Sequence, residues 1–239
     1  MKPRPGRALT SIMVVLTLTT GMIEAVSFLA LGPVFTAMQT GNLLLLAFAL
    51  TGAAGLSPAA AGVSCAGFVA GAVLGSLFES SVDARERRWF APALLAEGLL
   101  LGGGALVAWR TGVDGPPAAP AGGHHFGVIA FVAAAMGVRN ITTLRVRVPD
   151  VPTTLSTRAL TAFLGGLPHV ADPRIGSGAR HEGRRFASIG AMFAGGVLDA
   201  WMLHEGVRPA AVLTVPCLLV LLLGAASWAV PARRTSEPG

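Results

Sequence analysis

The chain has 239 residues, of which 53% are hydrophobic and only 13% are charged, and its mean hydropathy is +0.66. A soluble domain usually carries about 25% charged residues, so this composition excludes a soluble protein of ordinary surface chemistry. The net charge of +6 comes almost entirely from arginines in short connections between apolar segments, which argues against nucleic-acid binding and is typical of a membrane topology signal. We therefore predict an all-α, multi-pass membrane protein whose single domain is a transmembrane bundle over residues 1–239.

Eight apolar segments approach the roughly 20 residues that a membrane-spanning helix needs. They cover about residues 8–31, 33–54, 58–79, 90–110, 125–143, 152–168, 185–204 and 209–230. The first follows basic residues as a signal peptide does, but it continues past Glu24 without a convincing A-x-A site, so we expect a retained span. Pro58 and Pro209 suit the first position of a helix. The segment 152–168 is the weakest, because it is short, polar and contains Arg158.

The basic clusters distinguish two topologies. They lie at the N-terminus, at 85–88, at 139–147, at 174–185 and at Arg233-Arg234. If 33–54 and 152–168 enter and leave on the same face, every cluster falls on the cytoplasmic side together with both termini. This topology has six spans and two re-entrant or broken segments. Seven or eight full spans are the alternative, because 33–54 is long enough to cross.

An internal repeat divides the chain into halves at about 8–110 and 125–230. Three pairs of segments align in order: GMIE from Gly21 with GVRN from Gly137, TAMQTGN from Thr36 with TTLSTRA from Thr153, and VAGAVLG from Val69 with FAGGVLD from Phe193. With three spans in each half, the second copy must be inverted in the membrane. Inverted repeats with discontinuous helices near the midplane are typical of transporters and channels.

Two blocks of this sequence resemble the DUF1275, or YoaK-like, family of membrane proteins. The first is GMIEAVSFL from Gly21, followed by Thr40-Gly41-Asn42, and the second runs from Gly137 to Asn140 and on to VPDVPTT ending at Thr154. The resemblance implies a bacterial inner-membrane protein of six or seven spans, and it implies no established activity. The chain departs from the family pattern in having Glu24 in place of Asp and Thr157-Arg158 in place of Thr-Gly.

Glu24 is the most informative charged residue, because charge inside a membrane is costly and calls for a reason. One interpretation is a proton- or cation-binding carboxylate on a transport pathway. The other is structural: the carboxylate pairs with an arginine or caps a broken helix. The sequence leaves both interpretations open.

Gln39, Thr40, Gly41 and Asn42 form a polar cluster in an otherwise apolar segment. Glycine allows the backbone to open there, so that freed amides or carbonyls could face a solute. The alternative is hydrogen bonding between helices. The corresponding cluster of the second half supplies further candidates for a substrate or ion pathway, namely Thr153, Thr154 and Thr157.

Four more polar residues lie in or beside the spans. Arg139 is expected to extend to the cytoplasmic interface, and Asn140 aligns with Glu24 as its neutral counterpart. Glu97 and Asp199 could each pair with an arginine or line a cavity.

Chemistry of other kinds has little support in the sequence. No nucleophile–base pair, nucleotide-binding loop or metal-ligand spacing is present, so we expect neither an enzyme nor a cofactor or metal. The expected partners are the lipid bilayer and a small molecule or ion, and homo-oligomerisation stays open. The leading hypothesis is a small-solute transporter or channel, with a proton link through Glu24. The alternative is a membrane scaffold, sensor or assembly module.

Overall fold

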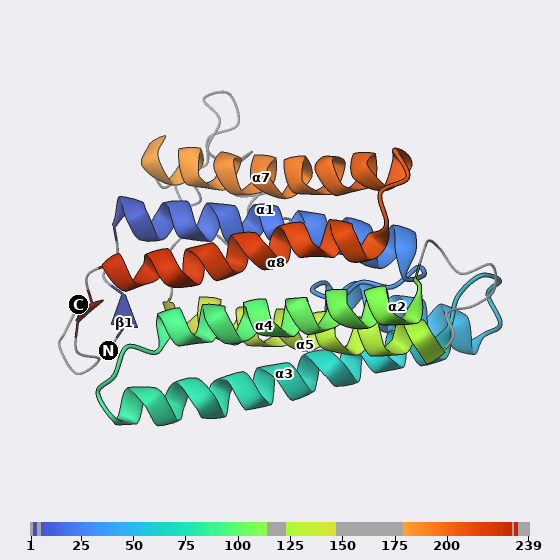
Figure 1. The fold of residues 1–239 in the computed structure, drawn as a ribbon, viewed down its shortest axis with the longest axis horizontal. Coiled ribbons are helices and arrows are strands. Elements are labelled where there is room, and N and C mark those ends of the chain that lie inside the picture. Colours follow the sequence, from blue (N-terminus) through green and yellow to red (C-terminus); the bar gives the residue numbers. More distant parts are fainter. Residues whose placement is uncertain (1, 4–5, 114–122, 147–178, 231, 234–239) are drawn as a thin grey trace.

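The computed structural model describes residues 2–3, 6–113, 123–146, 179–230 and 232–233. Within these ranges the chain forms helices α1 Arg7–Ala30, α2 Gln39–Leu50, α3 Pro58–Ala84, α4 Phe90–Thr111, α5 Gly123–Val146, α7 Ala179–His204 and α8 Pro209–Ala226. A short 3₁₀ turn, Ser227–Ala229, follows α8, and strand β1 (Lys2–Pro3) pairs antiparallel with β2 (Ala232–Arg233). All of these helices except α2 are long and apolar enough to cross a membrane, which confirms the predicted helical bundle (Figure 1).

Local sequence explains where several of the helices begin and end. Pro58 opens α3 directly after Ser57, whose hydroxyl oxygen accepts the backbone N–H of Ala60 at 3.2 Å. Pro209 likewise opens α8. Gly112 ends α4 in the left-handed conformation, with φ of 66°, and its N–H bonds to the carbonyl of Ala108.

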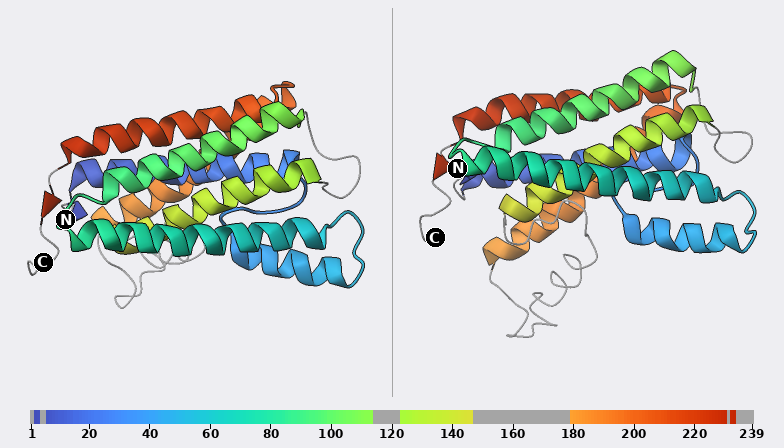
Figure 2. Two further views of the ribbon diagram at one scale, coloured as in Figure 1. Left: turned by 60° about the horizontal axis from the view of Figure 1, so that its bottom comes forward. Right: turned by 90° about the horizontal axis from the view of Figure 1, so that it is seen from below.

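Helix α2 is too short to cross a membrane. Its 12 residues rise about 18 Å at 1.5 Å per residue, whereas the hydrocarbon core is about 30 Å thick. It lies beside the first part of α3 at one end of the bundle (Figure 2). The segment 33–54 therefore contains no helix long enough to span, which the six-span topology requires. The other predicted break, 152–168, lies outside the described residues.

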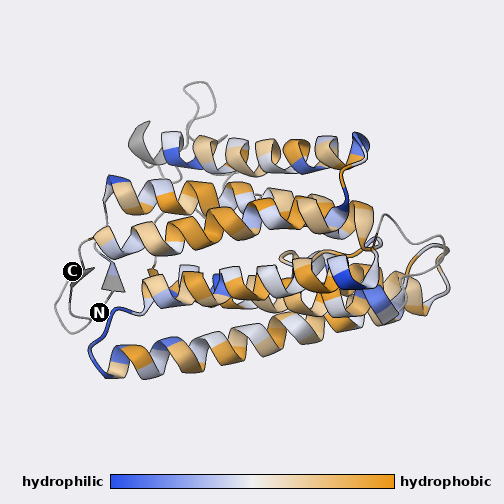
Figure 3. Cartoon of the chain, in the orientation of Figure 1, coloured by the Kyte–Doolittle hydropathy of each residue, from blue (hydrophilic) through white to orange (hydrophobic). Residues whose placement is uncertain are grey.

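The outward faces of the spans are apolar. Large exposed side chains include Leu74 and Leu77 on α3, Phe193 on α7 and Leu222 on α8, each more than 60% exposed. Figure 3 shows hydrophobic residues along the lengths of the helices and hydrophilic ones gathered at the α3–α4 turn. A surface of this kind is stable against lipid and not against water.

The described basic clusters collect at the end of the bundle that carries both termini (Figure 1). Arg88 of the α3–α4 turn donates to the carbonyl of Trp228 at 2.6 Å, which fixes that turn beside the end of α8. Arg145, in the last turn of α5, lies 5.1 Å from the centre of the ring of Trp89, which belongs to the α3–α4 turn. These contacts bring the α3–α4 turn, the end of α5 and the end of α8 together.

Two close helix crossings, each between a helix of one half and a helix of the other, repeat the same geometry. A Cβ atom added to Gly21 of α1 would lie 2.0 Å from the carbonyl oxygen of Met192 on α7. One added to Gly137 of α5 would lie 2.2 Å from the carbonyl oxygen of Phe68 on α3. Gly21 and Gly137 are 116 positions apart, and Phe68 and Met192 are 124 apart, the offsets of the sequence repeat.

The reciprocal contacts obey the same offsets. A Cβ on Gly71 of α3 would lie 2.0 Å from the carbonyl oxygen of Ala134 on α5, and one on Gly195 of α7 would lie 2.0 Å from that of Leu18 on α1. Leu18 and Ala134 are again 116 positions apart. Since α5 is the fourth span and α1 the first, the two helices run in opposite directions. The crossings α1–α7 and α3–α5 are therefore related by an inverted repeat.

Candidate functional site

The site is built around a non-helical segment, residues 31–38, that joins α1 to α2 inside the protein. Gly32 has a φ of 113° and ends the helical path after α1. Leu31, Val34, Thr36 and Ala37 are all buried. A non-helical backbone at this depth has no water to satisfy its N–H and C=O groups, so side chains must do so.

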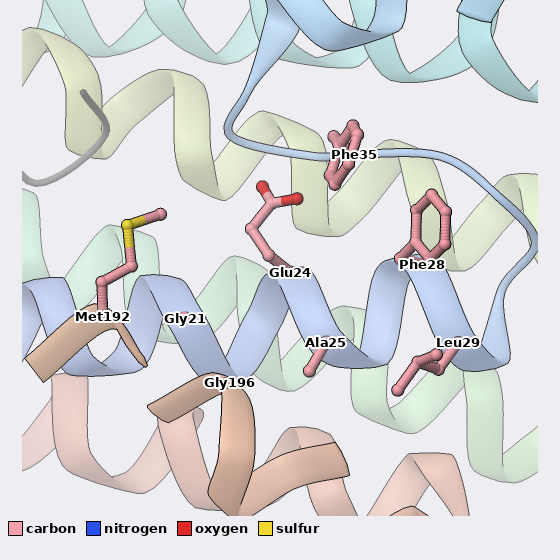
Figure 4. A pocket seen from close by; sticks show the side chains of 8 residues that line it. All are labelled: Gly21, Glu24, Ala25, Phe28, Leu29, Phe35, Met192 and Gly196. Atoms are coloured by element: carbon pink, nitrogen blue, oxygen red, sulfur yellow. The ribbon is translucent and has the colours of Figure 1, made fainter. Parts of the chain in front are cut away.

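Glu24 supplies acceptors for this segment from the neighbouring helix α1. Its carboxylate accepts the backbone N–H of Thr36 at 3.2 Å and, through the same oxygen, the N–H of Ala37. The carboxylate points toward the 31–38 segment in Figure 4. Ser27, one turn farther along α1, shares a hydrogen bond of 3.0 Å with the Thr36 hydroxyl. Glu24 thus supports the break between α1 and α2, which agrees with the structural one of its two sequence interpretations, although the N–H groups it accepts precede α2 rather than belong to its first turn.

Asn42 and Gln39 hold the same segment from the α2 side. The Asn42 side-chain oxygen accepts the N–H of Phe35 at 2.8 Å, and its amide donates to the Ser64 hydroxyl of α3 at 2.9 Å. Ser64 in turn donates to the Phe35 carbonyl at 2.6 Å. Gln39 donates to the carbonyl of Thr36 at 2.8 Å. Ser64 completes this network, although no motif or spacing in the sequence marked it as a site residue.

The remaining members of the predicted cluster have different surroundings. A Cβ on Gly41 would lie 2.8 Å from the Phe35 ring, so a small residue is needed there. Thr40 is exposed on the outer side of α2, away from Glu24. The structure therefore brings Glu24, Gln39 and Asn42 together around the broken segment and leaves Thr40 outside.

A groove of about 330 Å³ lies beside Glu24, between α1 and α7 (Figure 4). The Phe28 and Phe35 rings, stacked 5.2 Å apart, form one wall. Its lining residues are Gly21, Glu24, Ala25, Phe28, Leu29, Phe35, Met192 and Gly196. Glu24 is the only ionisable residue in this set. The groove could hold a small, largely apolar molecule next to a single carboxylate.

The expectation that Arg139 extends to the membrane interface is wrong. Its side chain is fully buried and pairs with Glu97 of α4, which is also fully buried, through an Nε–Oε1 hydrogen bond of 2.9 Å and a second, closer one from the guanidinium. The guanidinium also donates to the Leu16 carbonyl at 3.0 Å and to the Thr20 hydroxyl at 2.8 Å. The desolvated charge is thus satisfied inside the bundle. The pairing of Glu97 with an arginine was one of its two sequence interpretations.

A second buried carboxylate, Glu79 of α3, was missed by the sequence analysis. It accepts a hydrogen bond from the Thr142 hydroxyl of α5, and its other oxygen lies 3.7 Å from Nε of Arg145. Arg145 also pairs with Asp83 at 3.4 Å. The available signal was an acidic residue at the end of an apolar run, which was interpreted as the boundary of the span.

Among the described residues, Asp199 of α7 is the buried acid that has no bonding partner. Its exposed fraction is 0%, and neither carboxylate oxygen has a hydrogen-bond partner in the part of the chain that the structure describes. It does not line the groove, but Gly196, one turn earlier on α7, does.

The remaining candidate residues from the sequence form no further binding site in the part of the chain that the structure describes. Asn140 is half-buried at the α5 position that corresponds to Glu24, while Thr153, Thr154 and Thr157 lie outside the described residues. No group of three His, Cys, Asp or Glu residues that could hold a metal ion occurs within the described ranges.

A family model described as "Protein of unknown function (DUF1275)" matches residues 12–226, which is nearly the whole chain. Neither a curated protein nor a solved structure matches the chain.

Proposed function

The chain belongs to the DUF1275 family, and we propose that it is a proton-linked secondary transporter of a small solute in a bacterial inner membrane. The observation that carries this proposal is the pair of glycine crossings, α1–α7 and α3–α5, related by an inverted repeat. Two inverted halves can exchange their conformations, so that access to a central site alternates between the two faces. A channel built on the same halves would need no such exchange.

Glycine at the crossings suits this motion. Where backbones touch without intervening side chains, few interdigitated groups oppose a small rotation of one helix over the other. Each crossing joins a helix of the first half to a helix of the second. The halves also meet along α4, which packs against α5 and α8 and carries Glu97, the partner of Arg139.

The groove beside Glu24 is the proposed place of solute contact. Its walls come from α1, α7 and the broken segment, so it joins both halves at one of the crossings. The aromatic and aliphatic lining favours a solute with apolar surface, and the single carboxylate favours a positive or hydrogen-bond-donating group. No catalytic step is part of the proposal.

Charge distribution supports an orientation with both termini in the cytoplasm. The basic residues of the α3–α4 turn, the end of α5 and the start of α7 lie at the terminal-bearing end. The positive-inside rule assigns such an end to the cytoplasmic side.

Transport is tested with the purified protein in liposomes that contain a pH-sensitive dye. Amines, amino acids, carboxylic acids and sugars are added outside as separate classes under an imposed proton gradient. We expect one class to produce a saturable, solute-dependent proton flux that protein-free liposomes lack. A flux without saturation would favour a channel, and the absence of solute movement in every class would contradict transport.

A scaffold is the second candidate, and the polar network favours it. Gln39 and Asn42 bond to the 31–38 segment, to each other and to Ser64, so these residues also make sense as structural links. Under this alternative the groove would bind lipid or a partner helix. Co-purification of a stoichiometric partner, together with no solute flux, would support the scaffold.

A further inference from the structure

We propose that Asp199 is the proton-binding residue of this protein and that it is protonated in the conformation described here. The link to transport rests on the proposed function, whereas the protonated carboxyl does not. This assignment moves the proton link from Glu24, where the sequence suggested it, to α7.

The four buried acids that the described part of the chain contains differ in their bonding partners. Glu24 accepts two backbone N–H groups, Glu79 accepts a hydroxyl and lies near an arginine, and Glu97 is paired with Arg139. Each of these partners stabilises an ionised carboxylate. Among the described residues, Asp199 has no donor to either oxygen and no exposure to solvent. An unpaired buried charge is far more costly than a neutral carboxyl, so the neutral form prevails.

No cation on the neighbouring helices compensates Asp199. Helix α7 packs against α1 and, less extensively, against α8. On α1, Glu24 is occupied with the broken segment and Arg7 lies at the far end of the helix, in its first turn. On α8, Cys217 bonds to the carbonyl of Gly98.

The ionisable residues of α7 itself are also distant or exposed. Arg184 and Arg185 lie at least 14 positions before Asp199, about 21 Å along a helix. His204 is exposed at the helix end. Asp199 therefore lacks a counter-ion on every described element that packs around it.

The position of Asp199 links it to the moving contact. Met192, Gly195, Gly196 and Asp199 recur at three- and four-residue spacing, so they share the face of α7 that meets α1. Asp199 lies one turn beyond Gly196, and Gly196 lines the groove. Opening of the α1–α7 crossing would hydrate this carboxyl and let it release its proton.

The position that corresponds to Asp199 in the first half of the inverted repeat carries no carboxyl group. The repeat aligns Asp199 with Gly75 of α3, and a Cβ on Gly75 would lie 3.2 Å from Cα of Val138 on α5. At the equivalent position of the first half, α3 therefore packs directly against α5. The α1–α7 crossing thus holds an acid at a position that is glycine in its counterpart, where the nearest acid, Glu79, lies one turn farther along α3 and is bonded to Thr142.

The test uses N,N′-dicyclohexylcarbodiimide on the full chain in liposomes. The O–H of a protonated carboxyl adds across one C=N bond: the oxygen bonds to the central carbon and the proton goes to nitrogen. The acyl group then shifts to nitrogen and leaves a stable N-acylurea, with no other reactant. Peptide mass spectrometry locates the adduct.

We expect labelling of Asp199 that falls as the pH rises, is lost in Asp199→Asn and persists in Asp199→Glu. Glu205→Gln is the control, because Glu205 is an exposed acid six positions later and its removal leaves labelling unchanged. Difference infrared spectra provide a second measurement that needs no reagent access. They should contain a protonated-carboxyl band that disappears in Asp199→Asn.

Absence of that band, or labelling of Glu24 in place of Asp199, would overturn the proposal. A labelled Asp199 in a protein that moves no solute would retain the proton site and refute the transporter. Solute flux in a protein whose Asp199 is ionised would retain the transporter and refute the proton site.

Discussion

Arg139 of α5 bonds to Glu97 of α4 with both side chains fully buried, and it also reaches the Leu16 carbonyl of α1. Helix α4 belongs to the first half of the repeat and α5 to the second, so this ion pair fastens the halves to each other. Its disruption should therefore affect the whole bundle rather than one helix.

Removal of one partner leaves the other charge buried and unpaired. We expect Glu97→Gln and Arg139→Met each to lower the free energy of unfolding by about 3–5 kcal/mol, while the double variant loses less than the sum. Unfolding by denaturing detergent, followed by circular dichroism, measures the difference. Equal and additive losses would show that the two side chains act independently.

Glu24 should stabilise the protein because its carboxylate accepts hydrogen bonds from the backbone of the 31–38 segment. Glu24→Ala leaves the N–H groups of Thr36 and Ala37 without their acceptor, which costs about 1–3 kcal/mol. Glu24→Gln keeps one side-chain oxygen, so its loss should be smaller. Thermal unfolding in detergent compares the two variants. A more severe loss for Gln than for Ala would contradict this role of Glu24 as a hydrogen-bond acceptor.

The glycines of the crossings should tolerate no side chain. In Gly195→Ala the new Cβ would lie 2.0 Å from the Leu18 carbonyl oxygen, so the helices must separate. We expect a loss of about 1–3 kcal/mol, the usual range for overpacking. Gly62→Ala on α3 is the matched control, because nothing lies within 4 Å of its added Cβ. Equal melting temperatures for the two variants would exclude close packing at this crossing.

The six-span topology is tested by labelling single cysteines in a background without Cys65 and Cys217. Thr51 follows α2, and Glu86 lies in the α3–α4 turn at the opposite end of α3. In intact cells, a membrane-impermeant maleimide should label Thr51→Cys, and it should label Glu86→Cys only after permeabilisation. Labelling of both from outside would place the two turns on one face and contradict the topology.

Sequence patterns predicted the spans well because length and apolarity alone determine which segments cross a membrane. The repeat was also visible, since glycines at close crossings leave a spaced signature in each half, as at Gly21 and Gly137. Arg139 was misplaced because its position near a span end suits an interface, and its partner Glu97 is 42 positions away. The role of Glu24 depended on where the 31–38 segment turns back, which no local pattern specifies.

The most direct test of alternating access measures distances between the halves at both ends of the bundle. Spin labels at Ala54 and Glu205 report on one end, and labels at Glu86 and Gly183 report on the other; all four sites are exposed. Pulsed electron paramagnetic resonance in liposomes at low and high pH should give two populations of the label-to-label distance at each end. Their proportions should change with pH in opposite directions at the two ends. A single distance at each end, unchanged by pH, would contradict the rocking of the halves.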